Sequence, residues 1–375
     1  MNINSLSINI VLALVISILS ALIVYLVLPS IVRFSLKRKY VNTTKNHNIV
    51  VQRKTVRLGG VSLFFSALIL MLAVHLISLF SGTYHTGDKY VSFAPMHFGE
   101  IVALLILFVV GVYDDIKGLG YKIKFLFQTI ATGFVIYAGN YITNLNGLFG
   151  CYDISPAFGI YLLTPMFIIF LNNSINFIDG IDGLLSTISI CAFTAYGILF
   201  FLIGDMLYAT FALILIGSLS VYLYYNLFGM KRYATTKIIM GDCGSLFLGL
   251  TISIMAIKLW TVSALDLNTT LVSYAHTIAL TMLSIPLLDA VSVILYRLKN
   301  RKNIFLPDKN HIHHRLLAAG LSKHKVLAII ALINLCFVAI NLFLAAYLSI
   351  TYILLIDVAF WAMINIVIYS KRKTI

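Results

Sequence analysis

Aspartates flanked by glycine are the residues of this 375-residue sequence that could best do chemistry. They occur in three short segments, G-V-Y-D-D-I-K-G at 111–118, D-G-I-D-G at 179–183 and G-D-C-G-S at 241–245. Neighbouring carboxylates repel each other unless water or a cation relieves their charge. Their oxygens suit Mg²⁺, which takes one or two protein carboxylates and completes its octahedron with water and substrate phosphate. The segments therefore predict a site for a divalent cation and a phosphate.

A simpler interpretation of each acid stays open. A carboxylate in a loop can merely be solvated, and Gly241 with Asp242 can merely cap the apolar helix that follows, since Asp is a favoured N-cap residue. Capping does not exclude ligation, because a metal–phosphate unit at that place would lie near exposed N–H groups and the positive end of the helix dipole. In D-G-I-D-G each glycine lets the backbone turn tightly and approach a ligand.

Positive charge is concentrated in the segment R-L-K-N-R-K-N-I-F-L-P-D-K-N-H-I-H-H-R at 297–315. Eight Lys and Arg lie in residues 297–325, together with His311, His313 and His314. This composition predicts phosphate recognition. The alternatives are a transition-metal site and a loop that attracts anionic lipid head groups. The basic loop before the second apolar run, which contains Lys54 and Arg57 and ends in R-L-G-G at 57–60, can likewise bind phosphate or lipid head groups.

The elements that must position these residues are membrane helices. Hydrophobic residues make up 61% of the chain and charged residues 11%, against about 25% charged in soluble domains. A spanning helix needs about 20 apolar residues. We expect an all-α polytopic membrane protein, a single catalytic domain over 1–375 with about eleven transmembrane helices, from apolar runs near 8–30, 60–80, 98–113, 122–139, 158–175, 184–204, 207–227, 244–260, 273–296, 326–348 and 350–369.

The basic residues predict the orientation. No Lys or Arg precedes the first apolar run, so we expect an uncleaved first helix with its N-terminus outside and, after eleven crossings, a cytoplasmic C-terminus. This arrangement puts 25 of the 27 Lys and Arg on the cytoplasmic side, as the positive-inside rule requires. The net charge of +14 then records topology and not nucleic-acid binding. The three acid segments, the basic loops and Asp308 share this face, so we expect an active site built from cytoplasmic loops.

Taken in order, the motifs resemble those of the polyprenyl-phosphate N-acetylhexosamine-1-phosphate transferases, which include phospho-MurNAc-pentapeptide translocase. The resemblance runs from R-L-G-G at 57–60 to H-I-H-H-R-L at 311–316. Between them it includes the D-D pair at 114–115, N-x-x-N-x-x-D-G-x-D-G at 173–183, M-G-D-x-G-S at 240–245, P-L-x-D at 286–289 and P-D-x-x-H-I-H-H at 307–314. The H-I-H-H form is similar to the undecaprenyl-phosphate GlcNAc-1-phosphate branch. Departures from the usual pattern are Val56 and Ile304 for proline and Lys309 for arginine.

The resemblance implies a Mg²⁺-dependent transferase of the bacterial cytoplasmic membrane, in which Mn²⁺ is expected to substitute. It would move a sugar 1-phosphate, with GlcNAc favoured, from a UDP-N-acetylhexosamine to undecaprenyl phosphate and release UMP. The lipid-linked product would start the synthesis of a cell-envelope polysaccharide of the cell wall or the lipopolysaccharide. The implied partners are the two substrates and the lipid bilayer, without nucleic acid. A homodimer is left open.

The resemblance also implies roles for single residues. Asp242 would be the principal metal ligand, with Asp179 and Asp115 beside it. Asp179 and Asp182 would serve the metal or the nucleotide, while Asp114 and Asp115 would organise the lipid phosphate or accept its proton. The expected substrate-binding residues are Lys54, Arg57, Asn173, Asn176, Arg301, His311, His313 and His314. We expect direct attack by the lipid phosphate, which is already largely ionised because its second pKa lies near 6.

The main rival is a membrane transporter of an anionic solute. Transporters hold their ionisable groups near the bilayer midplane, whereas most acids of this sequence lie toward one face. Asp357 is an exception within the last apolar run, where an ionisable side chain is costly, and we interpret it as a structural polar contact. Asp289, near the end of the ninth run, is predicted to reach the cytoplasmic face.

Overall fold

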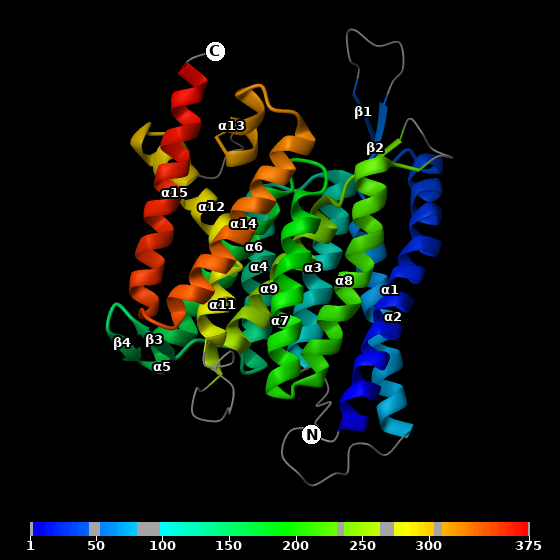
Figure 1. Ribbon diagram of the computed structural model, residues 1–375. Helices are drawn as coiled ribbons and strands as arrows, with labels where there is room; N and C mark the ends of the chain where they lie inside the picture. The colour runs from blue at the N-terminus through cyan, green and yellow to red at the C-terminus, as the bar shows by residue number, and fades with distance from the viewer. Residues whose placement is uncertain are drawn as a thin grey trace. The chain divides into compact units, whose positions relative to one another are not determined.

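A computed structural model describes residues 3–44, 53–80, 98–230, 236–262, 274–303 and 310–373 (Figure 1). Helices dominate it, and every apolar run of the sequence lies largely in helix. The helices are α1 (Ile3–Lys37), α2 (Gly60–Phe80), α3 (Phe98–Lys117), α4 (Tyr121–Tyr137), α5 (Pro156–Phe158), η2 (Gly159–Leu163), α6 (Thr164–Ile178), α7 (Leu184–Ile203), α8 (Met206–Phe228), α9 (Gly241–Thr261), α11 (Ala275–Thr281), α12 (Ser284–Lys299), α13 (Ile312–Ala318), α14 (Lys323–Ala345) and α15 (Ile350–Lys373).

The chain is an all-α polytopic membrane protein, as predicted. Within the described residues seven helices are long and apolar enough to cross a membrane, and the bent pair α11–α12 raises this number to eight. Helix α2 is apolar over a shorter stretch, 60–76, α3 carries four charged residues, and α4 is only 17 residues long. Eleven spans and the orientation of the termini therefore stay predictions.

The fold divides into two compact units, and the division falls within α9. Unit one comprises 1–120 and 189–248, with α1, α2, α3, α8, most of α7 and the start of α9. Unit two comprises 121–188 and 249–375, with α4, α5, η2, α6, the rest of α9 and α11 to α15.

In unit one α1 packs along α8 and α2 (Figure 1). Small residues allow this close approach, which is typical of membrane helices. The Ser66 hydroxyl donates to the Ser20 carbonyl oxygen at 3.2 Å and accepts from the Ser218 hydroxyl at 2.9 Å. A sheet at the end of these helices contains β2 (Arg53–Val56) between antiparallel β1 (Val41–Thr44) and parallel β5 (Thr236–Ile238). It joins the R-L-G-G segment to the chain that enters α9.

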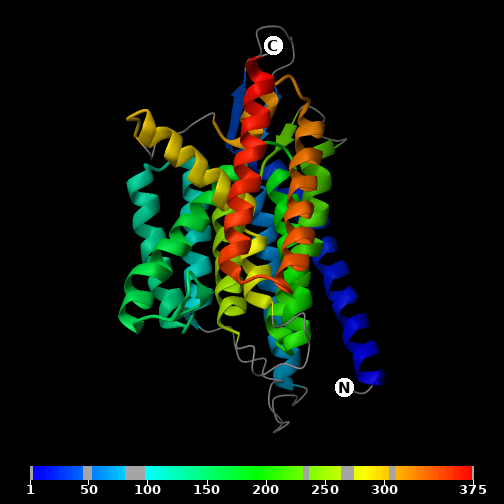
Figure 2. The same cartoon turned by 60° about the vertical axis from the view of Figure 1, so that its left-hand side comes forward.

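In unit two α6 packs against α4 and α12, and α14 and α15 lie side by side (Figures 1 and 2). A hairpin of β3 (Asn144–Leu148) and β4 (Cys151–Asp153) contacts α15. Helices α11 and α12 are bent by 51° at a short break after Thr281. The break changes the direction of the chain just before the segment that carries Asp289.

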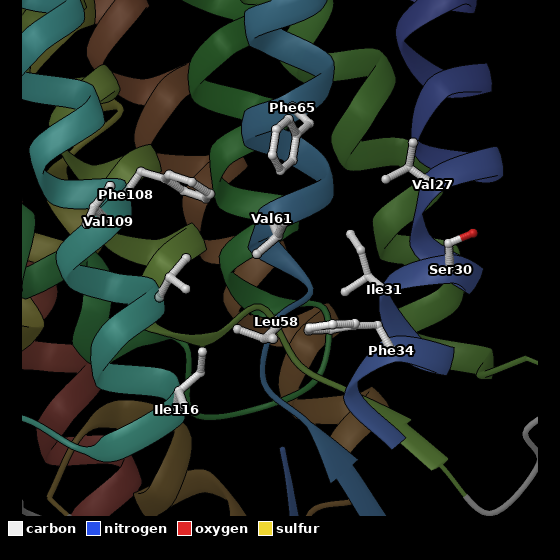
Figure 3. A pocket seen from close by; sticks show the side chains of 11 residues that line it. Val27, Ser30, Ile31, Phe34, Leu58, Val61, Phe65, Phe108, Val109 and Ile116 are labelled. Carbon is white, nitrogen blue, oxygen red and sulfur yellow. The ribbon is translucent and has the colours of Figure 1, made fainter. Parts of the chain in front are cut away.

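An apolar groove of about 530 Å³ lies in unit one among α1, α2 and α3 (Figure 3). Apart from Ser30 its lining side chains are apolar, and none is charged. Such a surface suits hydrocarbon, and it offers nothing to hold a diphosphate. The groove is lined by Val27, Ser30, Ile31, Phe34, Leu58, Val61, Phe65, Phe108, Val109, Val112 and Ile116.

Candidate active site

The acid cluster of unit one, which is Asp114, Asp115 and Asp242, forms where α3 meets the start of α9. The Asp115 Oδ1 accepts the backbone N–H of Asp242 at 2.9 Å, and its Oδ2 accepts that of Cys243 at 2.9 Å. First-turn N–H groups have no partner within their own helix. Asp115 therefore caps α9 from a different helix, and its charge faces the positive end of the α9 dipole.

Glycines make this junction possible. A side-chain Cβ at Gly111 of α3 would lie 2.4 Å from the Cys243 Cα, and one at Gly60 would lie 2.2 Å from the Gly244 Cα. Both distances are far shorter than atoms tolerate, so only glycine lets these backbones touch. The R-L-G-G, D-D and G-D-C-G-S motifs, distant in the sequence, thus meet at one place in unit one.

The other two acids differ in their surroundings. Asp114 is buried and accepts the backbone N–H of Leu119, which closes the turn after α3. Asp242 is half-buried in the first turn of α9, near enough to Asp115 for the two charges to repel. A divalent cation bound between the two carboxylates would relieve the repulsion between their charges.

The number of carboxylates fits Mg²⁺. No group of three or more His, Cys, Asp or Glu side chains is placed to hold a metal among the residues that the structure describes. Zinc sites use three or four such ligands, whereas Mg²⁺ is bound by one or two carboxylates and takes its remaining oxygens from water and substrate. The pair of Asp115 and Asp242 therefore suits Mg²⁺.

The two basic residues predicted for unit one lie in β2 and directly after it. Lys54 is exposed in β2, and Arg57 is exposed just beyond the strand. The Arg57 carbonyl oxygen lies against Gly241, where a Cβ would come within 1.9 Å of it. The backbone of Arg57 is thus part of the junction.

In unit two Asp289 of α12 organises the H-I-H-H segment. Asp289 is 1% exposed. Its Oδ2 lies 2.8 Å from the His311 Nδ1 and its Oδ1 accepts the Ile312 N–H at 2.8 Å, while an Arg315 guanidinium nitrogen lies 3.8 Å away. A carboxylate can only accept, so the His311 Nδ1 carries a proton and the Nε2 faces elsewhere. The pair fixes the ring orientation of His311 and the proton on its Nδ1.

His313 lies next to this pair. Its ring is nearly parallel to that of His311, with centroids 5.8 Å apart and an interplanar angle of 8°. Burial, reinforced by His314, lowers the pKa of His313 to about 4, so the ring is neutral at pH 7. Within the described part of the chain neither ring nitrogen has a hydrogen-bond partner. A buried polar group without a partner requires an explanation, and a substrate oxygen would supply one.

The D-G-I-D-G segment meets the histidines at a glycine. A Cβ at Gly180 would lie 2.0 Å from the His313 Nε2. Asp179 follows the last residue of α6, and the Asp182 Oδ2 lies 3.6 Å from the Lys323 Nζ. Since the Lys323 side chain is 58% exposed, this ion pair adds little stability. Unit two thus brings two of the predicted motifs together.

Other predicted residues have partners that the sequence did not reveal. The Asn173 amide nitrogen donates to the Gln128 Oε1 at 2.8 Å, and the Gln128 nitrogen donates back at 3.3 Å, which ties α6 to α4. The Asn176 carbonyl oxygen accepts the N–H of Asp179. Arg301 is exposed beyond α12 with a positive φ of 53°. Asp308, Lys309 and Ile304 lie outside the described residues. The contact between Asp289 and His311 was likewise not predicted from the sequence. The contact between Asn173 and Gln128 could have been suspected, because Gln128 is a polar residue inside an apolar run.

A family model described as "Glycosyl transferase family 4" matches residues 97–260. A protein of Bacillus subtilis (strain 168), "Probable undecaprenyl-phosphate N-acetylglucosaminyl 1-phosphate transferase", is 31% identical over 330 residues, which cover 88% of this chain and 83% of the relative. The chain belongs to glycosyl transferase family 4.

A second relative of this glycosyl transferase family 4 chain is "Undecaprenyl-phosphate alpha-N-acetylglucosaminyl 1-phosphate transferase" of Escherichia coli (strain K12), 30% identical over 267 residues and 68% of each chain. The protein of Yersinia pestis with the same description is 31% identical over 231 residues and 60% of each chain. The matched range 97–260 contains the D-D pair, the D-G-I-D-G segment and the start of α9. It ends before α12 and the histidines, so the Asp289–His311 pair lies outside the family model.

Proposed function

We propose that this protein transfers N-acetylglucosamine 1-phosphate from UDP-N-acetylglucosamine to undecaprenyl phosphate. An oxygen of the lipid phosphate attacks the β-phosphorus of the donor, the bond from that phosphorus to the bridging oxygen breaks, and UMP leaves. The observation that carries this proposal is the pair of carboxylates at the N-terminus of α9, a place that suits a divalent cation bound to a diphosphate. The choice of N-acetylglucosamine as the sugar and of undecaprenyl phosphate as the lipid follows the names of the relatives.

We assign the metal to Asp242, supported by Asp115. When bound, Mg²⁺ would neutralise charge on the diphosphate and on the departing UMP. Asp179 and Asp182, with Asn176 beside them, are proposed to bind the metal or the nucleotide. Lys54, Arg57 and Arg301 are proposed to bind phosphate oxygens. The sum of these contacts is positioning and charge stabilisation, which is what phosphoryl transfer requires of a protein.

Asp115 acts as a positioning group in this proposal. Both of its oxygens already accept backbone N–H groups of α9, so attack by this carboxylate on phosphorus would break two hydrogen bonds. The lipid phosphate needs no such intermediate, because its second pKa lies near 6 and it is largely ionised at neutral pH. This supports direct transfer, with Asp114 taking any residual proton.

The histidines of unit two hold anionic oxygens. Asp289 orients His311 so that, as an imidazolium, it donates its Nδ1–H to the carboxylate and its Nε2–H to an anionic oxygen, and the neutral ring of His313 can donate one hydrogen bond to an oxygen. Asn173 acts indirectly by fixing α6 through Gln128. His314 lies 4.2 Å from His313, ring centroid to ring centroid, and is proposed for the same phosphate-binding group.

We place the reaction on the cytoplasmic face of a bacterial cytoplasmic membrane, with the product priming a cell-envelope polysaccharide. The positive-inside count supports this side. Against the transporter, the acids proposed to bind the metal lie at helix ends: Asp115 in the last turn of α3, Asp242 in the first turn of α9, and Asp179 just after α6.

UMP release tests the function. Purified protein with UDP-N-acetylglucosamine, Mg²⁺ and undecaprenyl phosphate is expected to release UMP and to form a lipid diphosphate sugar, and release should stop when the lipid is omitted. UDP-N-acetylgalactosamine and UDP-glucose, used in parallel, define the sugar. Absence of lipid-dependent UMP, together with uptake of UDP-sugar by protein-containing liposomes, would establish the transporter instead.

A further inference from the structure

A buried polar cluster joins α14 and α15 to the break between α11 and α12. The Asp357 Oδ2 of α15 accepts the Ser284 hydroxyl at 3.0 Å and the Asn341 amide nitrogen at 2.9 Å. The same amide nitrogen reaches the Thr281 hydroxyl oxygen at 3.0 Å. These side chains are at most 6% exposed. A carboxylate inside apolar helices is costly unless it is paired, and this one receives two donors from two different helices.

Helix α15 holds α12 at a second point. The Trp361 indole N–H donates to the Ser292 hydroxyl oxygen at 2.7 Å. Trp361 follows Asp357 by one helical turn, and Ser292 follows Ser284 by about two turns. The two contacts therefore fix both the position of α12 and its direction relative to α15.

The break explains why a carboxylate lies there. Helix α12 begins after Leu283, which provides no side-chain cap. The first N–H groups of a helix lack partners within it, and hydrocarbon supplies none. The Asp357 carboxylate accepts a hydrogen bond from Ser284, the first residue of α12, and so lies at the positive end of the α12 dipole. A change of direction within the membrane is thus stabilised by Asp357.

The direction of α12 matters because Asp289 lies on it between Ser284 and Ser292, and Asp289 orients His311. We propose that Asp357 is a positioning residue: together with Asn341 and Trp361 it holds α12 so that Asp289 presents His311 to the phosphate groups of the donor. The inference rests on the proposed function. It gives a role to the last two helices, which lie outside the range of the family model.

The decisive measurement is the Kd for the UDP-sugar in the full-length protein, with kcat and KM beside it. Asp357→Leu should weaken UDP-sugar binding about three- to tenfold, the range that polar contacts between membrane helices reach in mutant cycles. Asp357→Asn keeps an oxygen for Ser284 and Asn341 and should restore binding to within about twofold of the parent. Leu355→Ala, at a 53% exposed position of the same helix, is the matched control and should change nothing.

A double-mutant cycle separates positioning from mere stability. If Asp357 acts through His311, the effect of Asp357→Leu should disappear in a His311→Ala background, because coupled residues are not additive. An equal loss of binding in both backgrounds, or an unchanged Kd for Asp357→Leu, would overturn the proposal. Should Asp357→Leu fail to fold, Ser284→Ala removes one hydroxyl only, and the same cycle with it decides.

Failure of the proposed function would look different. In that case the parent protein would give no lipid-dependent UMP. If the parent makes UMP and the cycle shows no coupling, the function stands and the role of Asp357 falls.

Discussion

Each of the two units contains an aspartate that caps the N-terminus of another helix, but the two aspartates differ in their remaining partner. In unit one Asp115 of α3 accepts N–H groups at the start of α9 with both oxygens. In unit two Asp289 of α12 accepts the first N–H of α13 with one oxygen and binds His311 with the other. Each carboxylate thus caps a helix from another helix. The two acids differ in the partner of the second carboxylate oxygen. In Asp115 that partner is another backbone N–H of α9, and in Asp289 it is the His311 ring, which the acid thereby orients.

The comparison shows that an aspartate in a motif has a role set by its partner. In unit one the acids concentrate negative charge at the positive end of a helix, which suits a cation. In unit two the buried acid is surrounded by His311, Arg315 and the Ile312 N–H, which suits an anion nearby. Changes at the acids of unit one and at the histidines of unit two test this division.

Removal of divalent metal should abolish turnover. The two carboxylates of unit one are hard oxygen ligands, so Mg²⁺ or Mn²⁺ added in excess over the chelator should restore activity and Zn²⁺ should not. The measurement is UMP release before and after chelation. Full turnover in excess chelator would show that the acids of unit one serve another purpose.

Asp242→Asn should lower kcat by about a hundredfold or more and leave the fold intact. The amide keeps the shape of the side chain and loses the charge that holds a cation close to the reacting phosphate. Thermal unfolding checks the fold, and the Mg²⁺ concentration needed for half-maximal rate should rise. Near-normal kcat at ordinary Mg²⁺ would mean that the metal ligand is a different residue.

His311→Ala should chiefly raise the KM for UDP-sugar, by about ten- to a hundredfold, because a hydrogen bond to a charged group contributes about 1.5–3 kcal/mol. Asp289→Asn should give a smaller change in the same direction, since the ring stays but loses the carboxylate that orients it and balances its positive charge. The KM for undecaprenyl phosphate provides the internal control. If Asp289→Asn lowers stability and leaves KM unchanged, Asp289 acts only as a helix cap.

Gly180→Ala should weaken UDP-sugar use several-fold, because the added methyl would press on the His313 ring and overpacking costs about 1–3 kcal/mol. Gly133→Ala, at a helical glycine with open space around it, is the matched control. Kinetics of both variants at limiting UDP-sugar check the prediction. Equal behaviour of the two would show that the contact between the D-G-I-D-G segment and the histidines has no functional weight.

The helices and the family could be predicted from the sequence alone. Apolar runs such as 184–204 and 244–260 form α7 and α9 because backbone polar groups in hydrocarbon must be satisfied within the segment. The acid and histidine motifs, in their order, indicated the family that the comparisons then showed. The 273–296 run was predicted as one span, and the structure bends it by 51° into α11 and α12, a pair that can still form one span. The Ser284 hydroxyl at the start of α12 donates to Asp357 of α15, a contact that the sequence did not reveal.

The sequence by itself determined which segments carry charge and which form apolar helices, since both depend on local composition. Only the tertiary structure decided the partner of each polar group. Asp115 meets the N–H of Asp242 across 127 residues, Asn173 meets Gln128 across 45, and His311 meets Asp289 across 22. No local periodicity encodes these separations, because they depend on how helices cross. The role of an aspartate as metal ligand, helix cap or orienting group of a histidine follows from that crossing.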